Sequence, residues 1–136
     1  MKKLVLLAGI LLASCASVNT YCPPEVVSKS LVEMGANWEE FNQEASVADT
    51  TSGLGVLFPL GELIKIKEKA NQIYVPECLV KAKQYQLETY EAAINAYSEY
   101  SGGGELLTDE VEVSLNKFLD EIDRINACLP DCKNSK

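Results

Sequence analysis

The spacing of apolar residues constrains this chain more than any other feature, because the apolar residues recur every three or four positions. An α-helix brings residues at these intervals onto one face. The first such stripe predicts a helix over residues 24–45, with Pro24 in the first turn and Glu25 at the positive end of the helix dipole. Its members are Val27, Leu31, Met34, Trp38, Phe41 and Ala45.

Three further apolar stripes follow, and turn-forming residues at 49–53, Pro76, the segment 101–104 and Pro130 separate or end them. They predict helices over about residues 60–75, from 76 or 77 to 100, and from an N-cap at Thr108 to Pro130. The stripes are Leu63, Ile66, Ala70 and Ile73; Leu87, Tyr90, Ile94 and Tyr97; and Val111, Leu115, Phe118, Ile122, Ile125 and Leu129.

The four expected helices define the fold class. No segment alternates apolar and polar residues with the period of a strand. Four amphipathic helices with mostly short connections bury their apolar faces most simply around one core. We therefore predict an all-α, antiparallel up-down four-helix bundle, formed as one domain by residues 24–132.

The first 14 residues have the layout of a secretory signal. Lys2 and Lys3 precede the apolar run 4–12, and small residues follow at Ala13 and Ser14. This run is too short to remain as a spanning helix. We expect residues 1–14 to be a signal peptide; the alternatives are a signal cleaved at a nearby site and a buried helix that is not cleaved.

The tetrapeptide Leu12-Ala13-Ser14-Cys15 resembles the lipobox of bacterial lipoproteins. The resemblance covers only residues 1–15. It implies cleavage before Cys15 and a diacylglycerol and further acyl groups, such as palmitate, on that cysteine. Two or more acyl chains make a stable membrane anchor. Residues 15–23 would then form a lipidated tether, and 133–136 a short tail.

Ala16 follows the expected lipid site, where an Asp often marks inner-membrane retention in Gram-negative lipoproteins. The resemblance therefore favours the outer membrane, facing the periplasm, if the host is Gram-negative. Seven residues join Cys15 to Cys22 and span at most about 25 Å. We expect the domain to lie close to the bilayer.

The charge of the chain excludes two classes of partner. The chain has 12 Lys and Arg and 20 Asp and Glu, a formal net charge of −8. Removal of residues 1–14 takes away Lys2 and Lys3 and no acid, which moves the charge to −10. Such a chain repels nucleic acid and anionic lipid surfaces, so we expect membrane attachment through lipid alone and no nucleic-acid partner.

Four cysteines remain in the expected mature chain: Cys22, Cys78, Cys128 and Cys132. In an exported protein an even number of thiols predicts two disulfides. The up-down helix order places all four at the end where Cys15 lies. We favour one bridge from Cys78 and one from Cys22 to the Cys128/Cys132 pair, with the pairing open. The alternative, a four-thiolate zinc site, lacks closely spaced ligand pairs.

The sequence supplies little for catalysis. It has no histidine, so the commonest acid–base group and the usual triads are absent. No segment matches a calcium loop, and Gly102-Gly103-Gly104 follows a predicted helix instead of opening one, unlike a phosphate-binding loop. We expect no enzymatic activity, no cofactor and no metal.

The predicted end far from the membrane combines acids with an apolar segment. Neither 31–63 nor 85–115 contains a Lys or Arg, and together they hold 13 of the 20 acids. The apolar segment 53–61 lies among them. It either folds down as a lid on the bundle or docks a protein partner, possibly a basic one, and both roles are compatible. The residues assigned to partner binding are Leu54, Val56, Leu57, Phe58, Glu105, Asp109 and Glu110.

These features predict a non-enzymatic interaction module of the cell envelope, acting as a scaffold, exclusion factor or inhibitor. The alternative is a carrier that holds a small apolar ligand inside the bundle near its tyrosines. Tyr90 and Tyr97 fit the core stripe, however, and we expect them, with Trp38, to be packing residues. Tyr85 and Tyr100 are expected to cover the rim of that core.

Overall fold

The structure is a computed structural model that describes residues 23–132, with side chains up to residue 127. The described part of the chain is all-α and contains no strand. Its four α-helices are α2 (Pro24–Thr50), α3 (Leu57–Gln72), α4 (Val80–Ser101) and α5 (Asp109–Cys132). Two 3₁₀-helices, η1 (Gly53–Val56) and η2 (Glu77–Leu79), precede α3 and α4.

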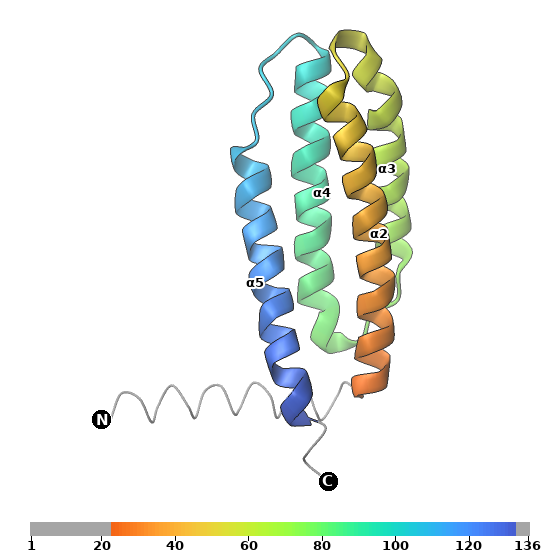
Figure 1. Cartoon of the computed structure of the whole chain (residues 1–136), viewed down its shortest axis with the longest axis vertical. Helices are drawn as coiled ribbons and strands as arrows, with labels where there is room; N and C mark the ends of the chain where they lie inside the picture. The colour runs from red at the N-terminus through yellow and green to blue at the C-terminus, as the bar shows by residue number, and fades with distance from the viewer. Residues whose placement is uncertain (1–22, 133–136) are drawn as a thin grey trace, which may run out of the picture.

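The helices lie side by side and successive helices run in opposite directions (Figure 1). The start of α2, η2 and the end of α5 lie together at one end, which we call the proximal end. The α2–α3 connection and the start of the α4–α5 loop lie at the opposite, distal end. The predicted all-α architecture with four helices is confirmed.

The first two helices differ in extent from the prediction. α2 runs five residues further, to Thr50. Two features extend it: Ala48 is buried, and the hydroxyls of Thr50 and Thr51 donate hydrogen bonds to backbone carbonyls of the last turn. α3 begins three residues early, directly after η1, and ends at Gln72. The Lys83 ammonium donates to the carbonyls of Asn71 and Ile73 at 2.7 Å, which satisfies acceptors at this helix end.

The last two helices follow the prediction more closely. α4 stops at the glycine triplet, where Gly103 adopts a φ of 90° and its N–H donates to the Tyr100 carbonyl. α5 starts after Thr108, whose carbonyl accepts from the Glu112 N–H. The predicted end at Pro130 is wrong by two residues, because a proline in the last turn removes only one donor and the helix continues to Cys132.

The predicted stripes form the core, which has a distal and a proximal cluster. The distal cluster centres on Phe41, Leu63 and Tyr90, and the rings of Phe41 and Tyr90 stack with centroids 3.8 Å apart. The proximal cluster includes Val27, Met34, Leu79, Phe118 and Ile125. Trp38 packs against both clusters and thereby joins them.

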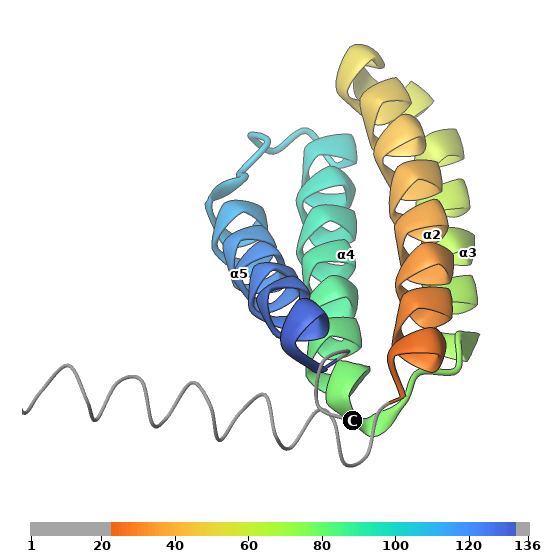
Figure 2. The same ribbon diagram turned by 60° about the horizontal axis from the view of Figure 1, so that its bottom comes forward.

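The four helices do not approach one another equally. α3 packs closely on α2 and α4, and α4 packs closely on α5, whereas α2 and α5 are not a closely packed pair. Figure 2 shows α5 leaning away from α2. The contact between them is made by large side chains: the rings of Trp38 and Phe118 have centroids 5.1 Å apart.

Candidate functional site

The distal segment 53–61 divides into inward and outward residues. Val56 is fully buried and Leu60 nearly so, which agrees with a lid on the core. Leu54 and Phe58 are each 76 % exposed and Leu57 is 53 % exposed. Of the four apolar residues assigned to partner binding, three therefore lie on the surface, and we call Leu54, Leu57 and Phe58 the distal apolar cluster.

Local geometry produces this division. Gly53 adopts a φ of 59° and starts the 3₁₀ turn, and a Cβ at Gly55 would lie 2.7 Å from the Thr51 Cγ2, so the Thr51 side chain would have to shift. Pro59 lies in the first turn of α3, where its missing N–H is not needed. The segment therefore folds as a continuous helical corner, with Val56 turned into the bundle.

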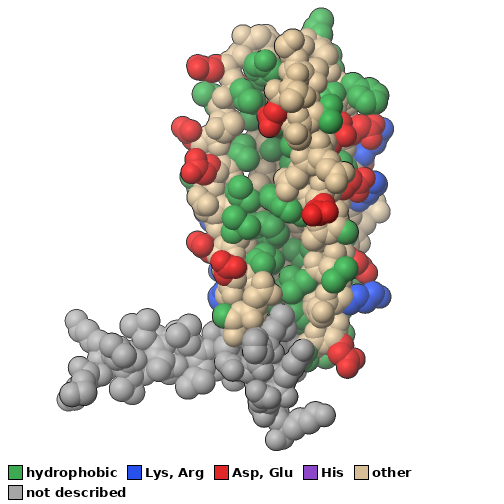
Figure 3. Space-filling view, in the orientation of Figure 1, with side chains coloured by type: hydrophobic (Ala, Val, Ile, Leu, Met, Phe, Trp, Pro, Cys, Tyr) green, Lys and Arg blue, Asp and Glu red, His purple; other side chains and the backbone are tan. Residues whose placement is uncertain are grey.

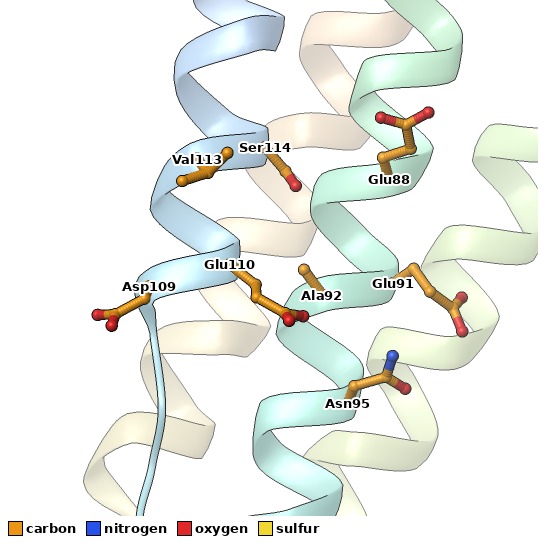
Figure 4. Close-up of a pocket in the computed structure, with 8 residues that line it drawn as sticks. All are labelled: Glu88, Glu91, Ala92, Asn95, Asp109, Glu110, Val113 and Ser114. Atoms are coloured by element: carbon orange, nitrogen blue, oxygen red, sulfur yellow. The ribbon is translucent and has the colours of Figure 1, made fainter.

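The acidic residues assigned to partner binding, Glu105, Asp109 and Glu110, are exposed and no salt bridge involves them within residues 23–127. Asp109 and Glu110 open α5 and line a groove of about 460 Å³ between α4 and α5. In Figure 4 Glu110 points across the groove toward Ala92, whereas Asp109 points away from α4. Glu88 and Glu91 of α4 also line this groove.

Two lysines of α3 form salt bridges with the neighbouring helices α4 and α2. Lys67 pairs with Glu91, and Lys69 pairs with Glu40 at 2.6 Å. These contacts neutralise acids next to α3 and leave the start of α5 negative. Coulomb attraction between the remaining carboxylates and a basic partner would increase the association rate of the two proteins, particularly at low salt.

The interior holds a polar network that the sequence did not reveal. The Tyr90 hydroxyl donates to Asn37 Oδ1 at 2.8 Å and accepts from Gln86 Nε2 at 2.8 Å. Asn37 Nδ2 donates to the Ile66 carbonyl, and Gln86 Nε2 donates to the Met34 carbonyl. The network ties α2, α3 and α4 together. The only sign of this network in the sequence was Asn37, a polar residue on the apolar face of the first predicted helix, three positions after Met34.

The two core tyrosines are buried as expected, and burial makes their hydroxyls weaker acids than an exposed tyrosine. Burial raises the pKa of Tyr90 well above its ordinary value of 10. Burial also raises the pKa of Tyr97, and the hydrogen bond from its hydroxyl to Asp49 Oδ1 at 2.6 Å raises it further. Both rings act as packing and hydrogen-bonding elements of the core.

The lipid site Cys15, the signal 1–14, Cys22 and the tail 133–136 lie outside the described residues. Cys78 lies in η2 and packs, half-buried, against the proximal cluster. Cys128 and Cys132 belong to the last turns of α5, and their side chains are not described. Within residues 23–132, no helix is both long and apolar enough to cross a membrane. The same residues contain no group of three or more His, Cys, Asp and Glu that could hold a metal ion.

No protein-family model matches the chain, and no match is found among curated proteins or solved structures.

Proposed function

We propose that the chain is a lipid-anchored bacterial lipoprotein whose helical domain is a non-enzymatic protein-interaction module of the cell envelope. The observation that carries this proposal is the exposure of Leu54, Leu57 and Phe58 at the end of the domain opposite to its entry point (Figure 1). Exposed apolar side chains bordered by charge are typical of docking surfaces.

The anchor is lipid on Cys15, in the position that the lipobox resemblance assigns. The tether, residues 15–23, reaches about 32 Å at most, and it joins the domain at Pro24, at the proximal end. α2 has 27 residues and is therefore about 40 Å long. The distal apolar cluster would then face away from the bilayer, toward partners in the periplasm if the host is Gram-negative and the outer membrane holds the lipid.

Two disulfides would fix the proximal end. Cys78 lies in η2, and the backbone of α5 ends at the same pole as η2. We propose bridges from Cys78 and Cys22 to Cys128 and Cys132, in either pairing. Bridges that close long loops stabilise by about 3–5 kcal/mol each in the chain-entropy description. A rigid base would suit a scaffold, exclusion or inhibitor protein that must resist the envelope environment.

The test is affinity capture from envelope extract with the lipidated protein and two matched variants. Phe58→Asp places a charge in the distal apolar cluster, whereas Tyr74→Asp changes an aromatic residue of similar exposure, 79 %, near the proximal end. We expect a saturable partner whose capture falls at least about tenfold in Phe58→Asp, the effect of 1.4 kcal/mol, and is unchanged in Tyr74→Asp.

Both variants should keep the helical circular dichroism of the parent chain, because both side chains are exposed. Equal capture by Phe58→Asp and the parent would reject the distal docking surface. Equal loss in both variants would show that the effect is not specific to the distal end, and it would also reject the distal docking surface.

A further inference from the structure

A second apolar surface lies along the seam between α2 and α5, away from the distal apolar cluster. A cavity of about 340 Å³ opens there. Its apolar lining consists of Leu31, Met34, Trp38, Phe118, Leu119 and Ile122. In Figure 3 hydrophobic side chains form a column between α5 and α2 on this face.

The seam is open because two helices that bound it do not pack closely. Trp38 and Phe118 form its floor through their ring contact, while Leu119 remains 45 % exposed. Gly35 also lines the cavity, and a Cβ built there would meet nothing within 4 Å. A glycine inside a helix costs about 1 kcal/mol relative to alanine, and here it leaves room for the backbone of another element.

The borders of the seam are acidic or neutral. At 100° per residue, Glu39 flanks it on α2, and Glu112 and Asp123 flank it on α5. The cations of these helices, Lys29, Lys117 and Arg124, project from other sides by the same rotation. Figure 3 agrees, since Lys and Arg appear at the edges of this face and not in the apolar column.

We propose that this seam binds an amphipathic helix of a partner protein whose apolar stripe is flanked by Lys or Arg. An apolar groove between two helices accepts a third helix through residues spaced three and four apart. The acidic borders favour basic flanks on that helix. They disfavour a second copy of this chain, because two copies would oppose borders of the same sign and each carries a net charge of −8.

The probe is a synthetic amphipathic peptide of about 18 residues with leucines on one helical face and lysines elsewhere. A matched peptide carries glutamate in place of every lysine. Trp38 is the single tryptophan of the chain, so its fluorescence reports directly on the seam. We expect saturable one-to-one binding of the lysine peptide with a change in Trp38 emission, and at least about tenfold weaker binding of the glutamate peptide.

Two leucine substitutions locate the site. Gly35→Leu fills the seam, whereas Gly61→Leu is the control, because its Cβ also has open space and lies on α3. We expect Gly35→Leu to weaken binding of the lysine peptide at least about tenfold and Gly61→Leu to leave it unchanged. Phe58→Asp should also leave it unchanged, which separates this site from the distal docking surface.

Four results would each overturn the proposal. These are equal affinity for the two peptides, full binding by Gly35→Leu, dimerisation of the free chain through the seam, and filling of the cavity by a neutral acyl probe while the lysine peptide does not bind. The outcome of this experiment does not depend on the lipid anchor.

Discussion

Asn37, Gln86 and Tyr90 link three helices through hydrogen bonds that are removed from solvent. Buried polar groups of this kind are costly unless they are paired, so the network favours one helix register over others. The apolar periodicity correctly placed Tyr90 in the core but could not predict its partners. Asn37 and Gln86 have ordinary polar side chains, and only the packed arrangement shows that they meet.

The buried tyrosines predict a loss of stability at high pH. Above pH 10 an unfolded chain releases the phenolic protons, whereas the raised pKa values of Tyr90 and Tyr97 keep them bound in the folded chain. Ionisation therefore favours unfolding, and stability falls as pH rises above 10. Each tyrosine should contribute a slope of about 1.4 kcal/mol per pH unit.

Urea unfolding between pH 8 and pH 11 measures this slope. Tyr90→Phe and Tyr97→Phe should each reduce it, because phenylalanine has no proton to release. A slope that stays the same in the double variant would contradict the assignment.

At the scale of elements, the helical period predicted all four helices and their buried faces, including the stripe from Val27 to Ala45. It was less successful at helix ends, where particular bonds decide the boundary, such as those from Lys83 to the end of α3. It also could not predict the open seam. Periodicity identifies the apolar face of a helix, but the distance between α2 and α5 depends on how Trp38 and Phe118 fit together.

The distal site was predicted in part. The composition of 53–61 identified an apolar corner set among acids, and the structure exposes Leu54, Leu57 and Phe58. The burial of Val56 follows from the 3₁₀ turn of η1, which the sequence analysis did not anticipate.

Alanine substitutions at three glycines should change the stability of the fold in opposite directions, depending on whether the glycine lies within a helix or in a turn. Gly35→Ala and Gly61→Ala should each stabilise the fold by about 0.5–1 kcal/mol, since both lie within helices and a Cβ at either has open space. Gly103→Ala should destabilise it by about 1–2 kcal/mol, because its φ of 90° disfavours L-residues. Urea midpoints measure all three. A neutral or stabilising Gly103→Ala would contradict the described α4–α5 turn.

At the scale of the whole molecule, the alternating helix directions give the domain two different ends. The chain enters α2 at the end where η2 and the last turn of α5 also lie, and the distal apolar cluster is at the other end. This polarity connects the proposed lipid on Cys15, the proposed disulfide base and the proposed docking surfaces. The sequence predicted it because the number of helices and their order determine which segments share an end.

Intact mass spectrometry of the protein extracted from the membranes of bacteria that express it tests the proposed anchor and base together. We predict a chain that begins at Cys15, carries a diacylglycerol and acyl groups on that residue, and has the mass deficit of two disulfides, which reduction removes. A membrane-bound chain without lipid, or one with four free thiols, would contradict this arrangement.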